Sequence, residues 1–429
     1  MGAAPTVAGF VSVVLLLCGG TAHAHVVFAH GRSYGVMRSP RATAKSLSSL
    51  GARVTPLTVG GPQSPVKYGN GPLMLSSKLY LIFWQAKAGE FESVYSEPIV
   101  HYAEDLQAED THTTDELSVA DQYTDKAGKA ITGKIEFGEA VTVTGYPPLE
   151  EAEGCTAAKS PCLTDKQIRE EILAQIELHK AQDWPTDPAS EPEAQYLLYT
   201  PEGVSVCEFG ECAPQMFCAY HGEITKIGPQ QKVAVYSALP YVSECDSGQA
   251  PAGVGGNKDA DGTLDSEIHE IVESATDPNP PSGYTDSGGE EVADKCTGPI
   301  EPQEFPKIYG TPLGGSVTEG SAFNQLIDGH SYYTQQIWSN APTVAPTPAS
   351  PGEPAGCAAR IGPSPSFTAP ASGQTGQAIQ FDGGGSYDIG AAISKYEWNF
   401  GDGSPPETTS GAKPTHYFLE PGPHQVSLR

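Results

Sequence analysis

Three side chains that could carry metal chemistry lie close together in the segment 265–278. His269 and Glu273 are four residues apart, so on a helix both project from one side and can bind the same cation. Glu270 directly follows His269, and a glutamate in that position can act as general base on a metal-bound water. The pattern predicts a zinc site with His269 and Glu273 as ligands and Glu270 as the catalytic residue.

A third protein ligand is needed to complete such a site. Helices of the zincin type, in which a His-Glu-x-x-His or related motif binds zinc, take it from about twenty residues further along the chain. Asp294 lies at about that distance from Glu273, and Asp286 and Glu290 are the alternatives. We therefore expect Asp294 to be the third ligand.

His221 is the second histidine with a possible role in the site. It follows the apolar segment 217–220, which is typical of a strand. At the end of a strand it could be a further metal ligand or could stabilise an oxyanion, and we include it with Glu270 among the candidate catalytic residues. The alternative is a structural histidine that donates a hydrogen bond.

Residues 257–268 resemble the start of a calcium-binding loop, with oxygen-bearing side chains at alternate positions and Gly262 at the sixth. Position twelve is Ile268, where a bidentate carboxylate is required. The pattern therefore predicts an acidic turn before the helix, with a weak cation site as the alternative.

Several elements could position these residues in a folded body that we place at residues 71–340. Apolar residues at helical spacing predict a helix around His269 that ends before Pro278, and Thr164 with Gln167 forms a capping box at the start of another helix. Apolar runs predict strands at 79–84, 196–199, 216–220 and 233–239. Strands mixed with helices predict an α/β or α+β zincin-like domain.

Composition indicates an exported protein. The formal net charge is −28, which disfavours binding to nucleic acid and to anionic membranes. Residues 1–24 have the apolar run and the small-residue ending of a signal peptide, and no other apolar segment is long enough to span a membrane. Eight cysteines remain after its removal, and an even number favours disulfides. Residues 25–70 are basic and rich in Gly, Ser and Pro, and we expect a flexible arm there.

The C-terminal part of the chain has a different character. Residues 341–359 are rich in proline and predict an extended linker. Beyond it, Trp398 begins the sequence Trp-Asn-Phe-Gly-Asp-Gly, an aromatic strand that runs into a tight turn. This pattern resembles PKD domains, the immunoglobulin-like all-β sandwich modules of secreted and cell-surface proteins. The resemblance implies a C-terminally incomplete PKD domain at 360–429 that acts as a spacer or adhesion module.

The body also resembles a known family. The segments Cys218-Ala-Tyr-His221, His269-Glu-x-x-Glu273 with Thr276-Asp-Pro278, and Asp294-Lys-Cys296 are similar to those of the phosphate-induced (exordium-like) extracellular proteins of plants and their bacterial relatives. The resemblance covers roughly residues 68–357. It implies a secreted, zincin-like α/β body, and it implies no particular activity.

Together these observations predict a secreted zinc-dependent peptidase or peptidase-like protein with a PKD module. The alternative is a non-catalytic extracellular binding or signalling protein that retains the scaffold. The expected partner is an extracellular protein or polysaccharide, with no nucleic acid and no membrane span. The sequence does not indicate the oligomeric state.

Overall fold

The structure is a computed structural model of the 429-residue chain. It describes residues 26–39, 64–344, 353–358 and 365–428, with internal gaps of which the longest are 109–114, 146–161 (Cys155 excepted), 186–192, 226–231, 242–256, 297–308 and 387–392. The predicted signal peptide at 1–24 and residues 40–63 of the predicted arm lie outside the described residues.

A seven-stranded mixed sheet forms the centre of the body, in the order β1-β2-β10-β11-β7-β4-β5. Four adjacent strands are parallel, namely β11 (Lys232–Leu239), β7 (Glu193–Tyr199), β4 (Ser77–Gln85) and β5 (Ile135–Thr144). The remaining three are antiparallel, namely β10 (Phe217–Thr225), β2 (Arg32–Arg38) and β1 (Val27–Ala29). The four strands predicted from the sequence are confirmed as β4, β7, β10 and β11.

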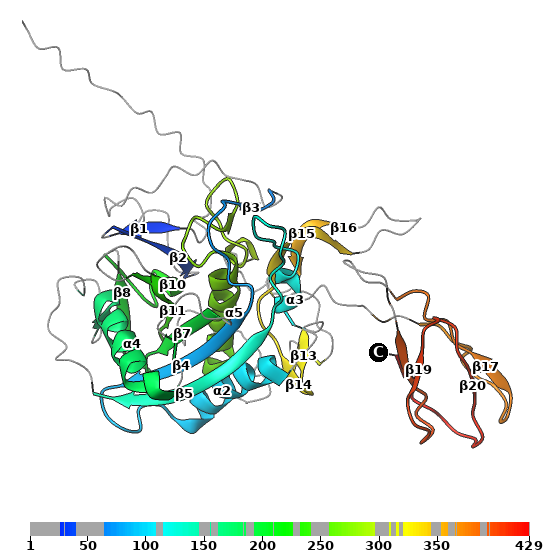
Figure 1. Cartoon of the computed structure of the whole chain (residues 1–429). Coiled ribbons are helices and arrows are strands. Elements are labelled where there is room, and N and C mark those ends of the chain that lie inside the picture. Colours follow the sequence, from blue (N-terminus) through cyan, green and yellow to red (C-terminus); the bar gives the residue numbers. More distant parts are fainter. Residues whose placement is uncertain are drawn as a thin grey trace, which may run out of the picture.

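Helices cover both faces of this sheet (Figure 1). On β4, Leu79, Leu81 and Phe83 pack with helices α2 (Ser93–Ala108) and α5 (Lys258–Thr276), whereas the alternate residues Tyr80, Ile82 and Trp84 pack with helix α4 (Asp165–His179). A strand buried on both faces needs such a continuous apolar run. The predicted mixed α/β body is therefore confirmed, while the likeness to zincins stays a prediction.

Small elements connect and flank the sheet. They are helix α3 (Leu117–Ala120), the 3-10 turns η1 (Lys180–Gln182) and η2 (Asp294–Cys296), the pair β3 (Lys67–Tyr68) and β12 (Tyr284–Thr285), the three-stranded sheet of β6 (Cys162–Thr164), β8 (Ser205–Glu208) and β9 (Glu211–Cys212), and the hairpins β13 (Gln325–Ile327) with β14 (His330–Tyr332) and β15 (Ile337–Val344) with β16 (Glu353–Ala358).

Helix α5 begins earlier than the sequence predicted. Asn257 caps it, because its side chain accepts hydrogen bonds from the backbone N–H groups of Asp259 (2.9 Å) and Ala260 (3.1 Å). The acidic turn predicted at 257–268 is therefore wrong for residues 258–268, which form the first three turns of the helix. Residues 260–276 are all buried. A wholly buried helix must bury its polar face as well, and this face forms the candidate site.

Two predicted segments contain strands where the structure describes them. The described residues of the predicted flexible arm form strands β1, β2 and β3, since backbone pairing with β10 and β12 orders them despite weak local patterning. The predicted linker at 341–359 contributes to the β15–β16 hairpin, and the disulfide between Cys296 and Cys357 joins that hairpin to η2.

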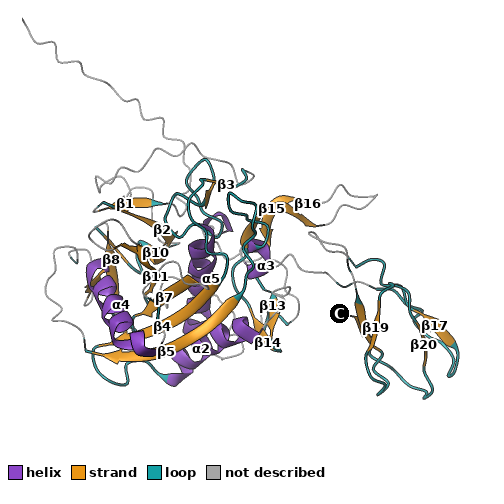
Figure 2. Ribbon diagram, in the orientation of Figure 1, coloured by secondary structure: helices purple, strands orange, loops and turns teal. Residues whose placement is uncertain are grey.

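Residues 365–428 contain strands and loops, and no helix among those described (Figure 2). One sheet pairs β17 (Ala378–Gln380) with β20 (Thr415–Tyr417), and the other joins β19 (Glu407–Thr409), β18 (Tyr396–Asn399) and β21 (Ser427–Leu428). Ile379, Phe381, Trp398 and Phe400 form the core between them. Gly401 has φ +68°, and a Cβ there would lie 2.2 Å from the Gln425 carbonyl oxygen, so this turn needs glycine.

Asp165 anchors helix α4 to the sheet. This buried carboxylate accepts hydrogen bonds from the hydroxyl groups of Tyr34 on β2 (3.2 Å), Tyr220 on β10 (3.1 Å) and Tyr236 on β11. Arg169, one turn along the helix, donates to it at 2.6 Å. One carboxylate therefore joins three neighbouring strands to the start of a helix.

We predict that Asp165→Ala lowers the free energy of unfolding by roughly 3–5 kcal/mol, because it removes the acceptor of a partly buried guanidinium and of the Tyr220 and Tyr236 hydroxyls, while Tyr34 can still donate to Glu208. Tyr220→Phe removes one of the hydrogen bonds to Asp165 and should cost only about 1 kcal/mol. Urea denaturation followed by circular dichroism compares the two variants, and equal losses would contradict this account of Asp165.

Candidate metal centre

His269, Glu273 and Asp294 come together inside the body. The Nε2 of His269 lies 3.1 Å from Glu273 Oε2 and 3.3 Å from Asp294 Oδ1, and one donor atom from each residue lies within 4.8 Å of the others. All three side chains are 0% exposed. Helix α5 supplies the first two and η2 supplies Asp294. The structure thus brings together the three residues that the sequence predicted as metal ligands.

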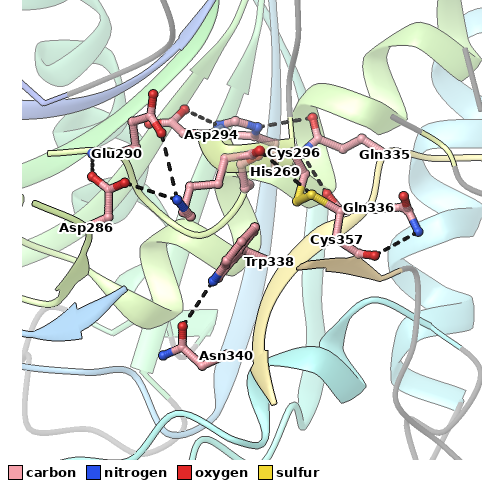
Figure 3. The surroundings of a disulfide bond; sticks show 12 residues. His269, Asp286, Glu290, Asp294, Cys296, Gln335, Gln336, Trp338, Asn340 and Cys357 are labelled. Carbon is pink, nitrogen blue, oxygen red and sulfur yellow. Dashed lines mark hydrogen bonds and ion pairs between the residues drawn. A yellow bond between two sulfur atoms is a disulfide. The ribbon is translucent and has the colours of Figure 1, made fainter. Parts of the chain in front are cut away.

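The ring of His269 is held in one orientation. Its Nδ1 lies 3.2 Å from Gln335 Oε1, while the Nε2 amide of Gln335 donates to the carbonyl oxygens of Ala293 and Gln336. That amide assignment makes Gln335 Oε1 the acceptor, so Nδ1 of His269 carries the proton. Nε2 therefore presents its lone pair to Glu273 and Asp294, as a metal-binding histidine does. Figure 3 shows Asp294, His269 and Gln335 in this row.

Glu273 is equally well oriented. Its Oε1 accepts hydrogen bonds from the backbone N–H groups of Ala293 (3.1 Å) and Asp294 (2.9 Å). Its Oε2 makes no hydrogen bond to any described residue, and neither does Nε2 of His269. Buried polar atoms without hydrogen bonds are costly, and here two of them face each other at 3.1 Å.

The two alternative third ligands lie elsewhere. Asp286 Oδ2 accepts a hydrogen bond from Lys295 Nζ at 3.0 Å, and Glu290 Oε2 lies 4.0 Å from the same nitrogen. Lys295 also lies over the ring of Trp338, 4.3 Å from its centroid. Asp286 and Glu290 therefore belong to an ion cluster around Lys295 (Figure 3).

His221 and Glu270, the two candidate catalytic residues, form a pair beside this centre. His221 Nδ1 lies 2.9 Å from Glu270 Oε2, and both side chains are 0% exposed. His221 lies on β10 and Glu270 on α5, so the pair joins the sheet to the helix. The hydrogen bond allows a proton to be held between Nδ1 and Oε2.

The site holds more carboxyl groups than its two histidines could neutralise if all of them were ionised. Burial raises the pKa of Asp294 to about 8 and that of Asp277 to about 7, and burial with the nearby Glu273 carboxylate raises the pKa of Glu291 well above its ordinary value. Burial acts to lower the pKa of His269, but the Glu273 and Asp294 carboxylates outweigh it and raise that pKa. In the absence of a cation, the cluster would take up protons to relieve this repulsion.

A divalent cation fits this donor set. Nitrogen and oxygen donors about 2.0–2.2 Å from a bound zinc ion lie roughly 3.0–3.5 Å from each other, close to the separations of His269 Nε2 from the Glu273 and Asp294 oxygens. The two oriented atoms that lack hydrogen bonds, His269 Nε2 and Glu273 Oε2, are the ones that would bind it. Zinc itself stays a prediction.

Three residues of the site were missed by the sequence analysis. Glu291 has both carboxylate oxygens buried without a hydrogen bond among the described residues, Gln335 orients His269, and Asp277 accepts from His221 through its backbone carbonyl at 3.1 Å. Glu291 stands beside Glu290 and has no distinguishing spacing. Gln335 lies 66 residues after His269, and no local pattern indicates that contact.

Comparison with known proteins supports both resemblances found in the sequence. Residues 361–429 match the family model of the PKD domain. The chain is 26% identical over 248 residues to "Protein EXORDIUM-like 3" from Arabidopsis thaliana, and the match covers 51% of this chain and 64% of that protein. The chain thus spans less than two thirds of the length of this relative. Both sequence resemblances are confirmed at this level.

One solved structure has weaker similarity. It is described as "Structural basis for the promiscuous specificity of the carbohydrate-binding modules from the beta-sandwich super family". Identity is 31% over 15% of this chain and 26% of that chain, and the TM-score of 0.15 is too low to indicate a shared fold. Within the described residues, no helix is both long and apolar enough to cross a membrane.

We predict that Gln335→Ala weakens metal binding about 10- to 100-fold, because His269 loses the acceptor that fixes its tautomer and orientation. Gln336→Ala is the matched control, since the Gln336 side chain donates to the Cys357 carbonyl oxygen and not to a histidine. Competition with a zinc-binding dye measures both affinities. Equal affinities for the two variants would show that Gln335 does not orient the ligand.

Proposed function

We propose that this protein is extracellular and that its body binds a divalent cation, preferably zinc, through His269, Glu273 and Asp294. The proposal rests on one observation: three donor atoms from two separate segments converge within 4.8 Å in a fully buried position. The PKD module and the similarity to an exordium-like protein support the extracellular location.

Burial favours a structural role for this cation. Structural zinc sites are closed, whereas catalytic sites keep a position open for water and substrate. Here all three ligands are 0% exposed. A bound cation would join α5 to η2, which the Cys296–Cys357 disulfide joins in turn to the β15–β16 hairpin. The body would then be a metal-stabilised scaffold, and the PKD module would attach it to an extracellular protein or polysaccharide.

We predict that removal of the metal with a chelator lowers the free energy of unfolding by about 3 kcal/mol when free zinc had been present at some hundred times its dissociation constant. His269→Ala should abolish both the bound zinc and the effect of the chelator. His101→Ala, at an exposed histidine of α2, is the control and should retain both. Metal analysis and thermal melts of the full chain test this. A wild-type protein that binds no zinc would disprove the proposal.

A zinc-dependent peptidase is the second candidate. The observation in its favour is the position of Glu270 directly after His269, with Oε1 buried and without a hydrogen bond among the described residues. Bound zinc would supply a water of lowered pKa. Glu270 could accept a proton at Oε1, and His221 would hold its other carboxylate oxygen. Because these side chains are 0% exposed, a peptide could reach the site only after a conformational change.

The peptidase candidate predicts that the zinc-loaded protein cleaves peptides from a mixed library and that Glu270→Gln lowers the rate about 100- to 10,000-fold while His269 still binds zinc. Mass spectrometry of the library measures cleavage. The control is Glu97→Gln, an exposed glutamate of α2. A zinc-loaded wild-type protein without cleavage would reject the peptidase and leave the scaffold function.

A further inference from the structure

We infer that the centre binds two divalent cations, the second one held by His221 and Glu270 and bridged to the first through Glu273. This inference rests on the proposed function, which supplies the first cation at His269, Glu273 and Asp294. It gives Glu270 the role of a ligand.

The tautomer of His221 leaves the lone pair of Nδ1 facing this second position. Its Nε2 lies 3.1 Å from the backbone carbonyl oxygen of Asp277, which can only accept, so Nε2 carries a proton. In the neutral ring Nδ1 then presents its lone pair toward Glu270 Oε2 at 2.9 Å and Glu273 Oε2 at 3.8 Å. A lone pair facing carboxylate oxygens needs a proton or a cation between them. A metal-bound histidine commonly donates its other N–H to a backbone carbonyl in this way.

Glu273 belongs to both groups of donors. Its Oε2 lies 3.1 Å from His269 Nε2 and 3.8 Å from His221 Nδ1. Backbone amides already hold Oε1, so Oε2 stays between the two imidazole rings. The donor atoms of His221, Glu270 and Glu273 lie within 4.8 Å of each other, as do those of His269, Glu273 and Asp294. One carboxylate oxygen is thus placed to bridge two cations.

Charge supports a second cation. Within the described part of the chain, the ion pairs of Glu270, Glu273 and Glu291 are all with His221 or His269. With Asp277 and Asp294 these residues make five buried carboxylates, and two divalent cations would neutralise most of their charge when they are ionised. Several buried carboxylates are tolerated when metal coordination compensates them.

Glu291 is the independent sign of a missing partner. It is 0% exposed, neither carboxylate oxygen makes a hydrogen bond to a described residue, and Oε1 lies 3.6 Å from His221 Nε2. When ionised, this carboxylate adds negative charge to the centre next to His221. Its one partner among the described ion pairs is His221, and 3.6 Å is too long for a hydrogen bond.

The strand next to His221 leaves space only for a glycine. Gly35 on β2 pairs with His221 on β10. A Cβ at Gly35 would lie 2.1 Å from His221 Cε1, 2.7 Å from His221 Nδ1 and 2.2 Å from Glu291 Oε2. A side chain there would displace the donors of the second position and leave His269 untouched. At Gly222, the next residue after His221, a Cβ would have no neighbour closer than 3.4 Å.

Zinc stoichiometry tests the inference on the full chain. Metal-free protein is titrated with Zn²⁺ by calorimetry, desalted and analysed for zinc, and circular dichroism verifies that each variant is folded. We expect two zinc ions per wild-type chain and one in His221→Ala. Gly35→Ala should also bind one, whereas Gly222→Ala should bind two.

The outcomes separate this inference from the proposed function. A wild-type chain that binds one zinc, lost in His269→Ala, overturns the inference and keeps the proposed function. A wild-type chain that binds none overturns both. Two ions that persist in both His221→Ala and Gly35→Ala place the second ion elsewhere and also overturn the inference. Cobalt-substituted protein gives a further readout, because two bridged Co²⁺ ions couple magnetically and two distant ones do not.

Discussion

The burial of ionisable side chains on helix α5 is the constraint around which the body is arranged. His269, Glu270 and Glu273 lie on a helix that is buried from residue 260 to 276, so no face of it is left for solvent. Each of these groups must find its partner inside the protein. The partners come from β10, from η2 and from the loop that carries Gln335, three segments far apart in the sequence. The central sheet, the disulfide-linked hairpin and the helix are thereby joined at one centre.

Local features of this arrangement could be predicted from the sequence. His269 and Glu273 are brought together by helical spacing alone, the capping box of Thr164 and Gln167 formed as expected, and the apolar run 79–84 identified a strand buried on both faces. Each of these features depends on residues within a few positions of one another. The approach of Asp294 to His269 was predicted only from its distance along the chain.

The remaining features depend on long-range pairing. Strand β2 has a glycine and two arginines among its seven residues. It forms a strand because its backbone pairs with β10. Pro342 lies in a strand of a hairpin although a proline-rich segment usually indicates a linker, because the ladder between β15 and β16 has an irregularity there that accommodates it. Glu291 and Gln335 gain their roles from contacts that no periodicity encodes.

The pairing of β2 with β10 also constrains the order in which the molecule can assemble. Arg38 at the end of β2 forms an ion pair with Glu211, 173 residues further along the chain. Strand β2 is synthesised early, but it cannot pair with β10 until about half of the polypeptide has been synthesised. Contacts this distant in sequence slow folding, because loop closure comes before any favourable contact. A cation at the proposed centre would thus be enclosed only after β2 has paired with β10, because Gly35 of β2 lies against His221.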